Sequence, residues 1–250
     1  MGACRIQYVL LLSLLGFCPC SDTLTCQMGS MVRLGSDLTR NEVEWIELKT
    51  VETSGEEICQ EIFLLIDVGT TALILGSKGP SIPSHRNVRN ITVFARGPGL
   101  KAIIFYHICD IELCNRANST RMLIDSIPSV APTVRGRQPC PICLHFKGIC
   151  NSYTNLAICP RGTRCYKSDL ALHGGGISAI FSISGCLVYP QKFLMKNQSS
   201  VGTISLLETL LMPKSKSPSH ELVPSILLTC MFGLLALCLQ RSVLSAEPIS

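Results

Sequence analysis

The sequence predicts a small, disulfide-rich, all-β protein built from two tandem domains. Short runs of β-branched and aromatic residues alternate with glycine-containing turns, a pattern typical of strands. Helical periodicity is hard to find between Thr25 and Cys186. Of the 15 cysteines, ten remain in two even sets of four and six when the two ends of the chain are set aside. Even sets indicate disulfides, which form in an oxidising compartment.

The first 20 residues are typical of a cleaved secretory signal peptide. Arg5 precedes an apolar run from Tyr8 to Phe17, and the small side chains of Cys18 and Cys20 follow where a signal peptidase can cut. This run is too short to cross a bilayer, so we interpret residues 1–20 as a signal and not as a membrane span.

The C-terminal segment is expected to direct a lipid anchor. A polar spacer with small residues at 212–222 leads into a hydrophobic segment at 223–250, the order found in such signals. The candidate attachment sites are three serines: Ser215, Ser217 and Ser219. The hydrophobic anchor signal would then be removed, together with Cys230 and Cys238. The alternative is a short transmembrane helix with Arg241 as its stop-transfer charge. We favour the anchor because about 18 apolar residues is the lower limit for a span.

The first domain is expected at 24–116. It contains four cysteines: Cys26, Cys59, Cys109 and Cys114. Its strands are runs of branched and aromatic residues at Ile62–Ile66, Thr70–Leu75, Asn90–Phe94 and Leu100–Tyr106. Glycine-containing segments between these runs are interpreted as turns: Asp67–Gly69, Gly76–Gly79 and Gly97–Gly99.

A linker at 117–138, which lacks a sustained apolar run, is expected to join a second domain at 139–211. The second domain contains six cysteines: Cys140, Cys143, Cys150, Cys159, Cys165 and Cys186. Two strands are predicted, at Arg164–Leu172 and Ile177–Ile183, with Gly174–Gly176 in the turn between them. Domains this small bury little apolar surface, so disulfides are expected to stabilise both.

Charge is distributed unevenly between the two halves. Residues 21–127 hold ten Lys or Arg against thirteen Asp or Glu, a net charge of −3. Residues 128–215 hold nine against two, a net charge of +7. The basic half can attract an anionic partner such as a sulfated glycan. An ordinary solvated surface, or attraction between the halves, explains the same pattern and is favoured. Nucleic acid is not expected as a partner, because aromatic and basic residues do not interleave.

Three sequons indicate a glycoprotein. They place candidate N-glycans on Asn90, Asn118 and Asn197. A sequon often occurs by chance, but three in a secreted chain predict that at least one carries carbohydrate.

No catalytic, cofactor or metal site is predicted. Cys140 and Cys143 have the spacing of a redox pair, but no βαβ pattern surrounds them, so structural disulfides are favoured. The same cysteines with His145 or His107 do not complete a reliably spaced zinc set. The sequence also lacks a serine-hydrolase elbow. Trp45 is either an exposed binding anchor or part of strand packing.

The end of the first cysteine segment resembles the urokinase receptor and lymphocyte antigen 6 superfamily. The resemblance rests on the residues Cys109-Asp-Ile-Glu-Leu-Cys114-Asn115, in which an asparagine directly follows the last cysteine of the segment. Leu24-Thr-Cys26 resembles the start of such a domain, and Ile58-Cys-Gln-Glu61 its middle. The segment from Cys140 to Cys186 resembles a second copy, although it lacks the final Cys-Asn.

The resemblance implies two tandem three-finger (snake-toxin-like) domains, a glycosylphosphatidylinositol anchor, and binding without catalysis. The branch it resembles implies a male germ-cell surface glycoprotein in the testis that binds or chaperones other cell-surface or secreted proteins in sperm maturation or fertilisation, with shedding as a route to a secreted form. The implied disulfides are Cys26–Cys59, Cys109–Cys114, Cys140–Cys165, Cys143–Cys150 and Cys159–Cys186. Ser54 and Pro80 replace a further pair found in relatives. The alternatives are a soluble two-domain protein resembling phospholipase inhibitors, and a secreted oxidoreductase.

Overall fold

The structure, a computed structural model, describes residues 23–45, 48–82, 87–97, 99–129, 133–150 and 155–211. The expected signal peptide and the expected anchor region, including the three candidate serines, lie outside the described residues. Strands make up 59% of the described residues and helix about 2%, which confirms the all-β prediction. The described residues include no helix with the length and apolar character needed to cross a membrane.

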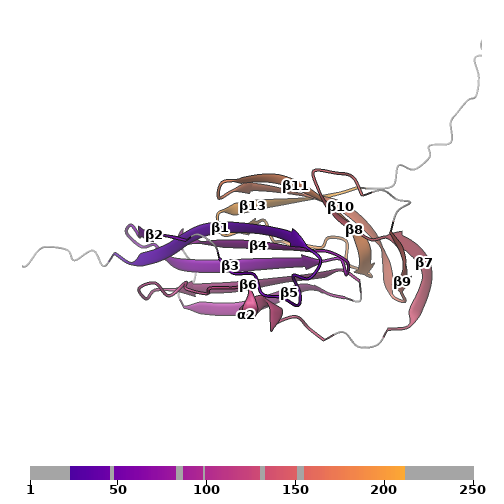
Figure 1. The fold of residues 1–250 in the computed structure, drawn as a ribbon, viewed down its shortest axis with the longest axis horizontal. Coiled ribbons are helices and arrows are strands. Elements are labelled where there is room, and N and C mark those ends of the chain that lie inside the picture. The colour runs from indigo at the N-terminus through magenta and orange to yellow at the C-terminus, as the bar shows by residue number, and fades with distance from the viewer. Residues whose placement is uncertain are drawn as a thin grey trace, which may run out of the picture. The chain divides into compact units, whose positions relative to one another are not determined.

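The first sheet has six antiparallel strands in the order β2-β1-β4-β3-β6-β5 (Figure 1). The strands are β1 (Thr25–Gly35), β2 (Lys49–Glu52), β3 (Ile58–Asp67), β4 (Ala72–Ser81), β5 (Val88–Arg96) and β6 (Lys101–Cys109). Strand β3 is buried along its whole length, as is most of β4. Burial on both faces explains why the centre of β3, Ile62–Ile66, and the start of β4, Ala72–Leu75, are continuous apolar runs instead of alternating.

The second sheet has five strands in the order β12-β13-β10-β11-β8. They are β8 (Cys143–Phe146), β10 (Thr163–Gly174), β11 (Ile177–Val188), β12 (Ser200–Val201) and β13 (Ile204–Leu210). Strands β7 (Arg135–Pro141) and β9 (Leu156–Pro160) form a separate two-stranded sheet. In β10, Tyr166, Leu170 and Leu172 are buried, whereas the residues that alternate with them are more exposed. One face of this sheet is therefore in the core and the other meets solvent.

A single hydrophobic cluster joins the two large sheets. The first sheet contributes Leu64, Ile66, Leu75 and Ile104, and the second contributes Leu170, Phe181, Ile183 and Leu206. A second cluster covers the opposite face of the first sheet and contains Phe63, Ile74, Phe105 and Leu123. The first sheet is thus covered on both faces, while the second is covered on one.

Gly99 lies at a close approach between the first sheet and the second. It has a φ of 95°, and a Cβ at this position would lie 2.4 Å from the carbonyl oxygen of Cys186. The next residue, Leu100, donates its backbone N–H to that same oxygen at 2.9 Å. Only glycine has both the conformation and the small size that this approach needs.

The segment expected to be a linker contributes to the core. Helix α2 (Arg121–Ile124) lies within it, and Leu123 on this helix is fully buried in the second cluster. Residues 135–138 belong to β7. The domain boundaries at 24–116 and 139–211 remain a prediction, but helix α2 in the segment between them packs against the first sheet, and the end of the segment pairs with β9.

Candidate binding surface

The open face of the second sheet carries exposed aliphatic side chains. Ala171 in β10 pairs with Ile180 in β11 on one side and with Leu207 in β13 on the other. Cross-strand partners project from the same face of a sheet, so these three residues form a row across three strands. The side chains of Ile180 and Leu207 are 53% and 65% exposed. We call this row, with Ile149, the aliphatic row.

A shallow hollow of ≈540 Å³ adjoins the aliphatic row and is lined by Lys147, Ile149, Asp169 and Ile180, among others. Ile149 is 81% exposed. The hydroxyl of Ser182 lies 2.6 Å from Asp169 Oδ1 and 2.7 Å from the carbonyl oxygen of Gly148, which fixes the polar floor of the hollow. An apolar patch with a polar rim is the usual composition of a protein-binding surface.

The sequence of β11 carries a signal for this exposed apolar surface. Strand β11 has apolar residues on both faces near its start, at Ile177, Ala179, Ile180 and Phe181. In a sheet with one solvated face, the outward positions are normally polar. Ile180 and Leu207 break that alternation, but the break is visible only when β13 and its register are known.

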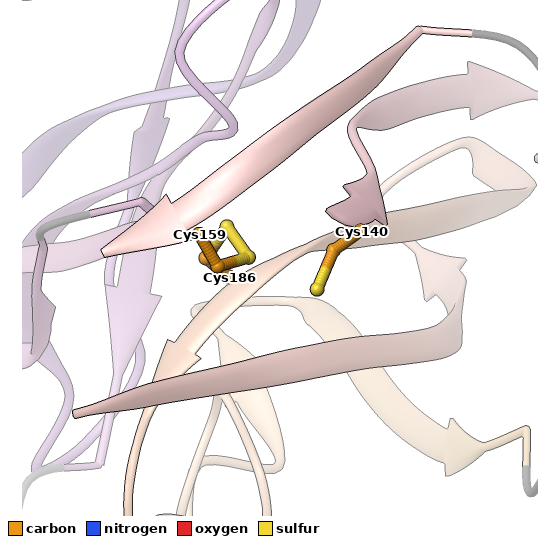
Figure 2. A group of neighbouring side chains, drawn as sticks. All are labelled: Cys140, Cys159 and Cys186. Atoms are coloured by element: carbon orange, nitrogen blue, oxygen red, sulfur yellow. A yellow bond between two sulfur atoms is a disulfide. The ribbon is translucent and has the colours of Figure 1, made fainter. Parts of the chain in front are cut away.

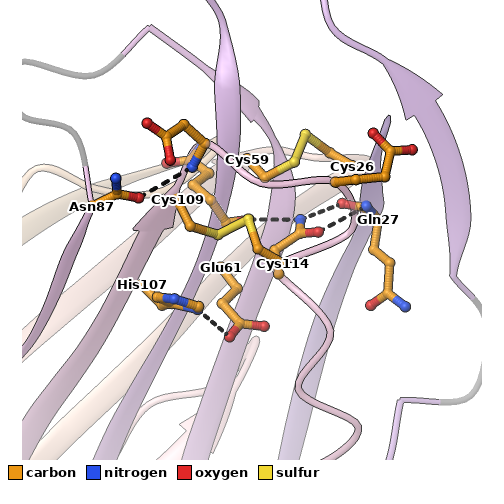
Figure 3. Close-up of a disulfide and its surroundings, with 12 residues drawn as sticks. Cys26, Gln27, Cys59, Glu61, Asn87, His107, Cys109 and Cys114 are labelled. Atoms are coloured by element: carbon orange, nitrogen blue, oxygen red, sulfur yellow. Dashed lines mark hydrogen bonds and ion pairs between the residues drawn. A yellow bond between two sulfur atoms is a disulfide. The ribbon is translucent and has the colours of Figure 1, made fainter. Parts of the chain in front are cut away.

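A cluster of buried charged side chains lies in the first sheet. Lys78 Nζ lies 3.3 Å from Glu61 Oε2, and the side chains are 0% and 4% exposed. The other Glu61 oxygen lies 2.9 Å from His107 Nδ1 (Figure 3). Burial lowers the pKa of Lys78, and the negative charge of Glu61 opposes this effect. Lys78 also donates to the carbonyl oxygens of Asn115 and Ala117 at 2.8 and 2.6 Å, so the cluster holds the chain that follows β6.

Trp45 has a packing role. Its ring centroid lies 5.7 Å from that of Phe63, and Lys78 Nζ lies 5.2 Å from the Trp45 ring. Trp45 also belongs to the side chains packed against the second hydrophobic cluster. It therefore covers β3 and β4 and is not a free binding anchor.

The five disulfides join the same pairs that the family resemblance implies. They are Cys26–Cys59, Cys109–Cys114, Cys140–Cys165, Cys143–Cys150 and Cys159–Cys186. Cys140 and Cys143 are bonded to different partners, so they are not a redox pair in this structure. The sulfur atoms of Cys140, Cys159 and Cys186 lie within 4.8 Å of one another (Figure 2). Each belongs to a disulfide, whereas a cysteine that binds a metal does so as a thiolate. His145, which the sequence does not favour as a zinc ligand with these cysteines, contacts the carbonyl oxygen of Phe146.

Asn115 closes the first group of disulfides. Its side-chain nitrogen donates to the carbonyl oxygens of Gln27 and Gln60 at 2.7 and 3.0 Å. Its side-chain oxygen accepts the backbone N–H of Gln27 at 2.9 Å, beside the Cys26–Cys59 and Cys109–Cys114 bridges (Figure 3). Asn115, which follows the last cysteine of the first set, thus joins β1 to β3 and is completely buried.

The chain is similar to known proteins in sequence and in fold. The chain is 33% identical to mouse testis-expressed protein 101 over 214 residues, which cover 84% of each chain. It is 38% identical to mouse CD177 antigen over 194 residues, which cover 76% of this chain and 24% of that protein. The chain thus spans about a quarter of the length of CD177 antigen. The crystal structure of mouse testis-expressed protein 101 superposes with a TM-score of 0.62 at 29% identity, covering 75% of this chain and 97% of that chain.

The chain belongs to the lymphocyte antigen 6/urokinase receptor family. A related protein is bovine Ly6/PLAUR domain-containing protein 4, at 25% identity over 185 residues. No family model matches the sequence. The resemblance to the family and the prediction of tandem small disulfide-rich domains are confirmed. Membership of the lymphocyte antigen 6/urokinase receptor family supports a role as a cell-surface protein and makes catalysis an unlikely activity.

Ser54 and Pro80, which the family resemblance places where relatives have a further cysteine pair, occupy an exposed position and a strand position. The Ser54 hydroxyl donates to Glu57 Oε2 at 2.8 Å, and its backbone N–H donates to the same oxygen at 2.9 Å. These two bonds lower the pKa of the exposed Glu57 carboxyl. Pro80 lies in β4 opposite Cys59 of β3.

The asparagines of all three sequons are exposed. Asn90 lies in β5, Asn118 precedes helix α2, and Asn197 precedes β12. Each is accessible for carbohydrate in the folded chain.

Proposed function

We propose that the protein is a lipid-anchored glycoprotein of the male germ-cell surface that binds or chaperones other surface proteins in sperm maturation or fertilisation. The family membership and the identity to testis-expressed protein 101 support the setting. The aliphatic row supports the binding role, because it is a solvent-exposed apolar surface on a sheet whose other face is fully packed.

The chemistry of the aliphatic row suits a protein partner. Ile149, Ile180 and Leu207 offer aliphatic area without ionisable groups, so burying them removes no charge from water. Fully burying one such side chain contributes roughly 1.5–3 kcal/mol. Lys147 and Asp169 at the hollow provide charges of both signs at the rim, where they can select the orientation of a partner.

Charged substitutions in the aliphatic row are expected to abolish binding to germ cells. The full-length chain, purified and fluorescently labelled, is titrated onto isolated male germ cells. The double variant Ile180→Asp with Leu207→Asp should bind at least tenfold more weakly, because each carboxylate must be desolvated in the interface. Ile111→Asp is the matched control, since Ile111 is 67% exposed and lies in the first half. Equal loss in both variants, or none in the double variant, would contradict the proposal.

The proposed anchor gives a second, independent expectation. Phosphatidylinositol-specific phospholipase C should release the protein from the surface of expressing cells, because the lipid is joined through its phosphate. Replacing the candidate serines together (Ser215→Leu, Ser217→Leu and Ser219→Leu) should reduce surface delivery, because attachment needs small residues. Retention of the wild-type protein after enzyme treatment, with a detectable peptide ending at Ser250, would establish the transmembrane alternative.

A further inference from the structure

Strand β5 forms the longest free edge of the two large sheets. Its nine residues, Val88–Arg96, pair only with β6 within the described part of the chain. The other edge strands are short: β2 and β8 have four residues each and β12 has two. Short edges resist pairing with other chains, whereas a long free edge is a template for another strand. A bulge between Val93 and Ala95 protects only the end of β5.

Two sequons lie on one face of this edge. Asn90 is in β5 itself and is the cross-strand partner of Tyr106 in β6, so both side chains project from the same face. The hydroxyl of Tyr106 donates to Gln198 Oε1 at 2.5 Å. Gln198 directly follows Asn197, an exposed residue with a φ of 63°. Asn90 and Asn197 are far apart in sequence, yet they flank the same tyrosine.

The third sequon lies on the opposite face. Arg89, next to Asn90 in β5, pairs with His107 and so projects from the other side of the sheet. Arg89 and His107 line a hollow of ≈300 Å³ together with Asn118. The three sequons therefore surround the edge formed by β5 and β6, one on the strand and one beside each face.

We propose that N-glycans on Asn90, Asn118 and Asn197 shield the free edge of β5 and prevent it from pairing with β5 of a second copy of this chain. A pairing strand must approach to about 4.8 Å. A glycan on β5 and glycans beside both of its faces occupy that space. The inference rests on the proposed glycosylation and assigns the carbohydrate one function, which is to keep the chain monomeric.

The test compares the association of glycosylated and unglycosylated protein. The full-length chain is purified from mammalian cells in mild detergent, and glycan occupancy at each asparagine is measured by mass spectrometry. Association is followed by sedimentation over a range of concentrations. The wild type should carry glycans on the three sites and remain monomeric. The triple variant Asn90→Gln, Asn118→Gln and Asn197→Gln should form dimers with a dissociation constant at least tenfold lower than that of the wild type.

A rescue variant separates edge pairing from other forms of association. Adding Ile91→Lys to the triple variant places a charge on β5, which is an alternative way to protect an edge. It should restore the monomer. Endoglycosidase treatment of the folded wild-type protein gives the same comparison without a folding step. The proposal is overturned if Asn90 is unoccupied, if the deglycosylated protein stays monomeric, or if the lysine fails to restore the monomer. The germ-cell assay uses Ile180 and Leu207, so its failure would leave this test unaffected.

Discussion

Replacing Lys78 with methionine is expected to lower the free energy of unfolding by about 3–5 kcal/mol, the cost of leaving one partner of a buried ion pair alone. Methionine keeps most of the volume but removes the positive charge that lies 3.3 Å from Glu61. It also removes the donor for the carbonyl oxygens of Asn115 and Ala117, which are part-buried or buried. The measurement is denaturant unfolding of the wild type and the variant at neutral pH.

Two further variants show whether the charge is responsible. The double variant Glu61→Leu with Lys78→Met should be more stable than Lys78→Met alone, because it buries no unpaired carboxylate. Arg121→Met is the control, since the Arg121–Asp125 pair has side chains 66% and 58% exposed. Breaking an exposed pair changes stability by about 0–1 kcal/mol. A Lys78→Met effect as small as that of the control would show that the ammonium is not stabilising the first sheet.

Removing the Cys159–Cys186 disulfide is expected to lower stability by about 3.5 kcal/mol in the loop-closure model. The bridge closes a sequence separation of 27 residues, which the unfolded chain would otherwise explore. Substitution of both cysteines by alanine avoids a free thiol. Cys186 also accepts the backbone N–H of Leu100, so the variant tests a bridge that lies at the contact between the two sheets.

The Cys143–Cys150 disulfide provides the matched comparison. It closes a separation of 7 residues, for which the same model gives about 2.4 kcal/mol. Thermal and denaturant unfolding of the two double-alanine variants should rank them in this order. If the short bridge costs as much as the long one, local packing around the sulfur atoms and not the entropy of the unfolded chain determines the effect.

The sequence predicted the strands that are both apolar and bounded by glycine. All six predicted runs, from Ile62–Ile66 to Ile177–Ile183, fall in strands β3, β4, β5, β6, β10 and β11, except for the two threonines before Ala72 and for Leu100 before β6. The predicted turn at Gly76–Gly79 is wrong, because these residues continue β4 and pair with β3. These strands form the centre of each large sheet or its longest edge, where apolar side chains and turns give the strongest signal. Gly174, Gly175 and Gly176 all have positive φ and form the predicted turn between β10 and β11.

The remaining strands could not be predicted because their partners stabilise them. Strand β1 contains two glycines and several polar residues, and it becomes a strand by pairing with β2 and then with β4. Strand β13 alternates between more buried and more exposed residues, but it follows a polar segment. Its place in the second sheet depends on its pairing with β10. The aliphatic row was not predicted for the same reason, since Ile180 and Leu207 are placed on either side of Ala171 only by the pairing of β10 with β11 and β13.

The hydrophobic cluster shared by the two sheets has a consequence for synthesis on the ribosome. The first sheet is complete in sequence at Cys109, whereas the last strand of the second sheet ends at Leu210, about 100 residues later. At roughly 5–20 residues per second, this interval lasts about 5–20 s. During that time Leu64, Ile66, Leu75 and Ile104 have no second sheet to cover them. This apolar face therefore stays uncovered until β13 emerges, and a chaperone that binds apolar surface is expected to cover it during that interval.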